Sequence, residues 1–112
     1  MIESFVSRGD PQIESLVEKI AQDLIANRHI PAATYRIQFN DKFTFRDAEA
    51  IIPYLHELGI SDVYASPILK AFPGSTHGYD ICDHSQLNPE LGTVEDFDRF
   101  VETLHAHDMK LI

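Results

Sequence analysis

Residues 75–84 hold the side chains best suited to chemistry. The run Ser75-Thr76-His77-Gly78-Tyr79-Asp80 is followed by Cys82, Asp83 and His84, which gathers two imidazoles, two carboxylates, a phenol and a glycine within ten residues. Polar groups at this density, in a loop between framework elements, usually serve a ligand. The alternative is a solvated loop whose Asp and Ser side chains only cap turns.

The residue types of this stretch suit an uncharged polyol. Tyr79 offers a flat ring that can stack on a sugar face and a hydroxyl for hydrogen bonding. His77 and Asp80 can donate to and accept from hydroxyl groups. Gly78 lets the backbone come close to a ligand or take a positive φ.

Other chemistries fit the stretch less well. Its two histidines and two aspartates are possible metal ligands, but their spacing matches no Cys/His zinc site, and the chain has no HExxH helix. Neither Ser75 nor Ser66 lies in a GxSxG elbow, Cys82 lacks a catalytic signature, and no Gly-rich phosphate loop is present. We therefore expect no metal and no cofactor.

Length and composition indicate one modest domain. The chain has 112 residues, of which 44% are hydrophobic, and 9 Lys and Arg against 18 Asp and Glu give a net charge of −9. This acidity disfavours nucleic acid and anionic membranes as partners. The single cysteine and the lack of a basic leader or of ~18 consecutive apolar residues are compatible with a cytoplasmic protein. Residues 109–112 resemble a strand that has just begun, so the chain looks cut.

Residues 1–30 are expected to be a leader that contains a helix. Asp10 can cap a helix that begins at Pro11 and runs to about Asn27. An apolar stripe recurs along it at helical spacing, and we expect this stripe to pack on the outside of whatever follows. The stripe consists of Ile13, Leu16, Val17, Ile20 and Leu24.

Residues 31–112 alternate between strand and helix patterns, which is typical of a parallel βα sheet. Tyr35, Ile37 and Phe39 alternate with polar residues, as in a strand. Thr44 with Asp47 resembles a capping box for a helix that ends at Gly59. We expect strands at 34–39, at 60–66 and from 110, and we expect the second of these strands to be covered on both faces. Helices are expected at 45–58 and from Thr93, the first of them bent at Pro53 and with Leu58 buried. Residues 67–92 are expected to be a connection.

In parallel α/β architectures ligands bind beyond the carboxyl ends of the strands. The connection 67–92 follows the second strand and contains the polar stretch, so it is where a site belongs. Its length of 26 residues exceeds the usual few and indicates a functional loop.

Several blocks of residues 31–112 together resemble the start of the malto-oligosyltrehalose synthases, a family of the α-amylase superfamily. The most specific block is PGSTHGYD at 73–80 after YASP at 64–67, a spacing that separates this family from ordinary amylases. The resemblance implies the N-terminal portion of a TIM (β/α)8 barrel, with residues 1–30 outside it. The other blocks are ATYRIQFN (33–40), FTF (43–45), IPYL (52–55), LGIS (58–61) and LNPELG (87–92).

The resemblance also implies roles for single residues. Tyr79 would stack against the sugar at the cleaved bond, and His77 would bond the hydroxyls of that sugar. Asp80 would be a sugar ligand or a support for the loop, and Asp83 a support. Arg36 and Gln38, at the end of the first strand, could reach the same cavity or be structural. Phe72 departs from the family pattern, which has a basic residue there.

The activity implied is intramolecular transglucosylation, in which the reducing-end α-1,4 linkage of a maltooligosaccharide becomes an α,α-1,1 linkage. The catalytic Asp and Glu residues would come from later strands, so this stretch would not catalyse the reaction without the remainder of its own barrel. One alternative is a hydrolase or glucanotransferase of the same superfamily. A second is a non-catalytic sugar-binding fragment, which the open edges of so short a parallel sheet disfavour.

Overall fold

The computed structural model describes residues 10–112, which form parts of two compact units divided between Ile30 and Pro31. The described part of the first unit contains helix α2 (Pro11–Asn27). The side chain of Asp10 accepts a hydrogen bond from the Gln12 amide at 2.9 Å, so the predicted cap is confirmed. Residues 1–9 of the expected leader lie outside the described residues.

Every side chain of the apolar stripe on α2 is at least half exposed. The packing that we expected for this stripe therefore stays a prediction. None of the helices within residues 10–112 combines the length and the apolar character that a membrane span requires.

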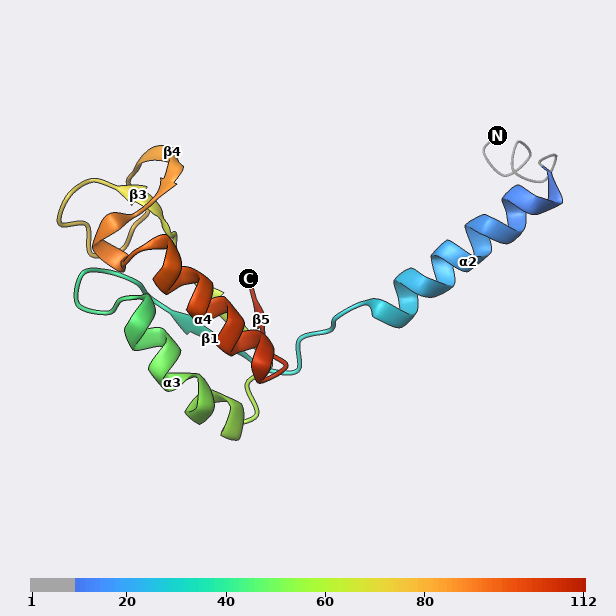
Figure 1. Cartoon of the computed structure of the whole chain (residues 1–112), viewed down its shortest axis with the longest axis horizontal. Coiled ribbons are helices and arrows are strands. Elements are labelled where there is room, and N and C mark those ends of the chain that lie inside the picture. The colour runs from blue at the N-terminus through green and yellow to red at the C-terminus, as the bar shows by residue number, and fades with distance from the viewer. Residues whose placement is uncertain (1–9) are drawn as a thin grey trace. The chain divides into compact units, whose positions relative to one another are not determined.

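The second unit contains a sheet of three parallel strands, β1 (Thr34–Ile37), β2 (Asp62–Ala65) and β5 (Lys110–Leu111), in the order β1-β2-β5. Helices α3 (Phe45–Glu57) and α4 (Val94–Ala106) connect successive strands and pack side by side against the sheet (Figure 1). This alternation confirms the predicted βαβ order, which is the repeating unit of a (β/α)8 barrel.

Local signals set the bounds of α3 as the sequence predicted. The Thr44 amide donates to the Asp47 carboxylate at 2.9 Å, and Gly59 takes φ +84° after the helix. Pro53 lies inside the helix without ending it. The predicted burial of Leu58 is wrong, since the side chain is 56% exposed; the helix ends at Glu57, and Leu58 is the capping residue beyond its buried stripe.

The core lies between the sheet and the two helices, and phenylalanine rings occupy its centre. The ring of Phe39 meets those of Phe45 and Phe100 edge-on, with centroids 5.2 and 5.8 Å apart. Aromatic pairs in this geometry add to the free energy gained from burial alone. The remaining fully buried apolar side chains come from strands, helices and the segments between them: Ile37, Ala48, Ile52, Leu55, Val63, Leu91, Leu104 and Met109.

Strand β2 is covered fully on one face and only in part on the other, where Asp62 is 1% exposed. Val63 is fully buried under the helices, but Tyr64, on the opposite face, is 43% exposed. The prediction that this strand is covered on both faces is therefore wrong for the described residues, because the helices of this unit pack on the face that holds Val63.

The connection 67–92 is more ordered than the loop we predicted. It contains an antiparallel pair of strands, β3 (Leu69–Ala71) and β4 (Ile81–Leu87), followed by a 3₁₀ turn, η1 (Pro89–Leu91). The Phe72 amide donates to the Asp80 carbonyl at 3.2 Å and closes the base of the intervening loop. Residues 72–80, which we call the site loop, are therefore fixed at both ends by the strand pair.

Asp96 links the two helices electrostatically. Its buried carboxylate accepts hydrogen bonds from the Thr93 amide at 3.0 Å, from Nε of Arg46 on α3 at 2.9 Å, and from the guanidinium of Arg99. The Thr93 amide and then Arg46 lower the pKa of Asp96 from 3.8 to about 2. These donors all favour the charged carboxylate over the neutral acid.

The stability contributed by Asp96 should depend on pH. Because its pKa is lowered on folding, the contribution is complete above pH 3.8 and is lost as the pH falls towards 2. We expect the Asp96→Asn variant to melt at a lower temperature than the wild type at pH 7. The difference in melting temperature should shrink between pH 4 and pH 2; a difference independent of pH would contradict this account.

Substitutions of two glycines should differ in their cost, because both the surroundings and the backbone conformations of the two positions differ. A Cβ on Gly92, at φ +132°, would lie 2.9 Å from Oδ2 of Asp96 and 3.3 Å from Cδ2 of Phe45, whereas a Cβ on Gly59 would meet nothing within 4 Å. We expect Gly59→Ala to lower the free energy of unfolding by about 1–2 kcal/mol. Gly92→Ala should cost about 1–3 kcal/mol more, measured by chemical denaturation. Equal losses would show that the contacts with Asp96 and Phe45 do not matter.

Candidate functional site

The polar face of strand β1 holds the site loop in place. Gln38 and Asn40 donate through their side-chain amides to the Thr76 carbonyl, at 2.9 and 3.2 Å. Arg36 donates from Nη2 to the phenol oxygen of Tyr79 at 3.3 Å. Residues 36, 38 and 40 share one face because the two-residue alternation of β1 continues beyond its last residue, Ile37. The loop therefore lies beside the carboxyl end of β1, where a parallel sheet places its ligands.

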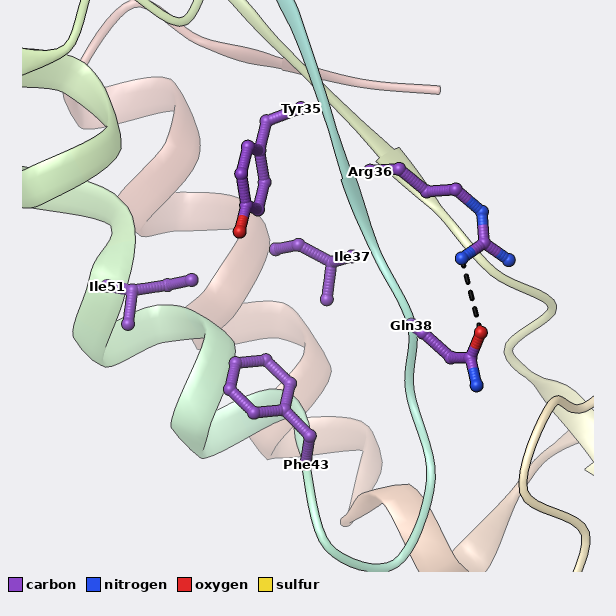
Figure 2. Close-up of a pocket in the computed structure, with 6 residues that line it drawn as sticks. All are labelled: Tyr35, Arg36, Ile37, Gln38, Phe43 and Ile51. Carbon is purple, nitrogen blue, oxygen red and sulfur yellow. Dashed lines mark hydrogen bonds between the residues drawn. The ribbon is translucent and has the colours of Figure 1, made fainter.

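Figure 2 shows which side chains lie on each side of the chain along β1. Arg36 and Gln38 lie on one side of the strand, joined by a hydrogen bond of 3.2 Å. Tyr35 and Ile37 lie on the other side, towards helix α3. A pocket of about 220 Å³ lies along this edge strand of the described sheet. It is lined by Tyr35, Arg36, Ile37, Gln38, Phe43 and Ile51.

This pocket adjoins the candidate site, because Arg36 and Gln38 line it, but neither His77 nor Tyr79 does. It follows the free edge of β1, where a parallel barrel would add another strand.

Gly78 brings the site loop close to the backbone after strand β2. It adopts φ +79°, and a Cβ at this position would lie 2.8 Å from the Pro67 carbonyl oxygen. Its amide donates to the Ser75 hydroxyl at 3.0 Å. Only glycine fits both the conformation and the space; the positive φ is one of the two roles expected from the sequence.

Tyr79 and His77 form the exposed surface of the loop. The Tyr79 side chain is 60% exposed, and its ring stacks on that of His77 with centroids 6.0 Å apart and planes at 29°. The Tyr79 amide donates to Nδ1 of His77 at 3.0 Å. Because Nδ1 accepts, the neutral imidazole carries its proton on Nε2, where it can donate to a ligand.

Asp80 belongs to the same loop, and its hydrogen-bond partner, Ser75, is also a residue of this loop. Its carboxylate accepts a hydrogen bond from the Ser75 hydroxyl, which lowers the pKa of Asp80. Nδ1 of His77 lies 4.0 Å from the same oxygen, Oδ1. Asp80 is therefore an ionised support for the loop.

Asp83 lies on strand β4 and makes its hydrogen bonds there. Oδ1 accepts from the amide and the hydroxyl of Ser85, at 2.9 and 2.6 Å, and these two bonds lower the pKa of Asp83. Its register partner across the strand pair is Lys70. These contacts stabilise the base of the site loop and do not extend to its tip.

The structure thus brings together five of the six residues that the sequence singled out. Arg36, Gln38, His77, Tyr79 and Asp80 form one connected network, whereas the contacts of Asp83 are separate. The sequence analysis missed Asn40. The two-residue period of Arg36 and Gln38, continued by one step, would have indicated it.

The geometry suits recognition of a neutral ligand with hydroxyl groups. The exposed ring of Tyr79, the imidazole of His77 and the guanidinium of Arg36 lie next to one another. A ligand ring with a hydrophobic face and polar hydroxyl groups could pack on the phenol and form hydrogen bonds with the polar groups beside it. Within residues 10–112, no three His, Cys, Asp or Glu side chains are grouped so that they could hold a metal ion.

Comparison with known proteins identifies solved structures similar to this chain. A maltooligosyltrehalose synthase from Arthrobacter ramosus is 41% identical with a TM-score of 0.71, over 73% of this chain and 11% of that one. A glycosyltrehalose synthase is 49% identical with a TM-score of 0.69, over 71% and 11%. The similarity therefore extends to both sequence and fold.

A curated relative from Mycobacterium tuberculosis, named after maltooligosyl trehalose synthase, is 44% identical over 85 residues. The aligned region covers 71% of this chain, but the chain spans only about 11% of the length of that relative.

The sequence model of the alpha-amylase catalytic domain matches residues 48–112, which is more than half of the chain. The parallel strands and their covering helices are those of a partial (β/α)8 barrel, so the predicted fold class is confirmed. The chain belongs to the alpha-amylase family.

Proposed function

We propose that the complete protein converts the reducing-end α-1,4 linkage of maltooligosaccharides to an α,α-1,1 linkage by intramolecular transglucosylation. The enzyme would be an isomerase, because the glucose unit is moved and not released. Identities of 41–49% with solved synthases that form such trehalose ends support this reaction over simple hydrolysis. We further propose a cytoplasmic location, where the exposed thiol of Cys82 would stay reduced.

The observation that carries the proposal is the exposed, stacked pair of Tyr79 and His77. A pyranose ring has a flat face of C–H groups that can pack on the phenol ring, and its hydroxyl groups can accept from Nε2 of His77. Burying this ring against a sugar would contribute roughly 1.5–3 kcal/mol to binding. Tyr79 would bind the sugar next to the bond that breaks, and His77 would orient it.

The reacting carboxylates would come from parts of the barrel outside this chain. A retaining transfer uses a nucleophile and an acid/base about 5–5.5 Å apart. Of the described residues, Asp80 is the carboxylate in the exposed network, and Ser75 lowers its pKa, so it would be a poor proton donor. This stretch would therefore bind and orient the substrate, and the remainder of the barrel would break and form the bonds.

A second candidate is hydrolysis or intermolecular glucan transfer. The match to the general alpha-amylase domain favours it, because that domain is shared by enzymes with several outcomes. An exposed Tyr79 ring would serve these reactions equally well.

The products formed from maltopentaose distinguish the candidates. We expect the complete protein to convert maltopentaose into a product of the same mass without a reducing end, because the transfer is intramolecular. Reducing-end assays and mass spectrometry measure this directly. Shorter reducing sugars as the main product would establish hydrolysis, and longer ones would establish intermolecular transfer.

Loss of the Tyr79 ring should impair sugar binding. We expect Tyr79→Ala to lower kcat/KM for maltopentaose about 10- to 100-fold, because the apolar face of the sugar loses its partner. Tyr54→Ala is the matched control, since Tyr54 lies on the outer helix α3 and is 62% exposed, similar to Tyr79. If both variants lost activity equally, the stacking role would be wrong.

The close contact of Gly78 should be as important as its conformation. Gly78 and Gly74 both adopt φ +79° in the site loop, but only a Cβ on Gly78 would meet a neighbour, the Pro67 carbonyl. We expect Gly78→Ala to displace Tyr79 and to lower kcat/KM more than tenfold, which is over 1.4 kcal/mol. Gly74→Ala should change it less than threefold. Similar losses in both variants would mean that backbone strain alone accounts for the effect.

A further inference from the structure

We propose that Arg36 is a positioning residue for Tyr79, and that it directs the Tyr79 hydroxyl to donate its hydrogen to the sugar. This inference rests on the proposed function and extends it, since it assigns the polarity of one hydrogen bond at the site. It follows from the contacts of Arg36, from the chemistry of a guanidinium and from the charges around it.

The contacts of Arg36 connect strand β1 to the site loop. Nη2 donates to the Tyr79 oxygen at 3.3 Å, and Nη1 donates to Oε1 of Gln38 at 3.2 Å. Gln38 in turn donates from Nε2 to the Thr76 carbonyl at 2.9 Å. Because Gln38 is bonded on both sides, it holds the guanidinium of Arg36 in one orientation. The phenol of Tyr79 is therefore fixed at its oxygen as well as at its backbone.

The guanidinium sets the direction of the hydrogen bond. It carries five N–H donors and no acceptor, so the Tyr79 oxygen must be the acceptor in this contact. The phenol keeps its own hydrogen for another partner. Given that Tyr79 is 60% exposed, that partner would be a hydroxyl of the bound sugar. The imidazole of His77 would then donate from Nε2 beside it, so both groups would present donors to the ligand.

Arg36 differs from the other arginines of the second unit in the partners of its guanidinium group. Arg46 and Arg99 both form ion pairs with Asp96. Within residues 10–112, no carboxylate forms an ion pair with Arg36, although the whole chain has a net charge of −9. The partners of Arg36 are neutral oxygens that belong to the site, so its contacts serve the loop and not a salt bridge.

Kinetics of the complete protein on maltopentaose test this proposal. We expect Arg36→Met and Tyr79→Phe each to raise KM about threefold to tenfold, the effect of one lost hydrogen bond, with a smaller change in kcat. The KM of the double variant should exceed the higher KM of the two single variants by less than about twofold, because both changes remove the same directed hydrogen bond. Arg36→Lys should restore part of the loss, since an ammonium can still donate to the Tyr79 oxygen.

Lys42→Met is the matched control, because it removes an exposed cation from the turn after β1 and should leave KM unchanged. Multiplicative effects of Arg36→Met and Tyr79→Phe, or a KM for Arg36→Met equal to that of Lys42→Met, would overturn the proposal.

A crystal structure of the Arg36→Met variant provides a readout that does not depend on activity. We expect the Tyr79 ring to leave the rotamer it has in the wild type or to lose its order. A ring that keeps its place and order would overturn the positioning role. If the wild-type protein does not act on maltopentaose, the proposed function fails, and this structure still decides whether Arg36 positions Tyr79.

Discussion

The two-residue period of strand β1 is the constraint on which the site depends. Side chains at successive positions of a strand point to opposite faces, so Ile37 and Phe39 enter the core while Arg36, Gln38 and Asn40 face the site loop. A shift of the strand by one residue would exchange the two sets. The same hydrophobic burial that fixes the register of the sheet therefore also places the polar groups that hold Tyr79.

The site loop is held at three levels. The antiparallel pair of β3 and β4 closes its base, the near contact of Gly78 with the Pro67 carbonyl fixes its backbone, and Arg36 and Gln38 bind Tyr79 and Thr76 on either side of Gly78. Loops that carry function on a rigid scaffold lose less entropy when a ligand binds, because they are already ordered. In this arrangement an exposed aromatic ring can be both accessible to a sugar and fixed in direction.

The elements with local signals could be predicted from the sequence. Thr44 and Gly59 indicated the two ends of α3, Thr93 indicated the start of α4, and alternation indicated strand β1. The pair of β3 and β4 could not be predicted, since β3 has only three residues and β4 carries polar side chains without an apolar period. Its formation depends on pairing across the loop and not on local preference.

The residue types of the site were likewise predictable, but their partners were not. His77, Tyr79 and Asp80 stand together in the sequence, and the structure keeps them together. Arg36 meets Tyr79 across 43 positions of the chain, and Asn40 meets Thr76 across 36, so tertiary structure alone brings them together. Asp83 resembled Asp80 in the sequence, yet its position on β4 gives it Ser85 as its hydrogen-bond partner.

The central claim is that this stretch presents Tyr79 and His77 to a glucose unit. The most direct test is a crystal structure of the complete protein with a bound maltooligosaccharide. The account predicts a pyranose ring packed on the Tyr79 ring at about 4 Å, with Nε2 of His77 about 3 Å from a sugar hydroxyl. A sugar bound in the barrel without contact to either side chain would contradict it.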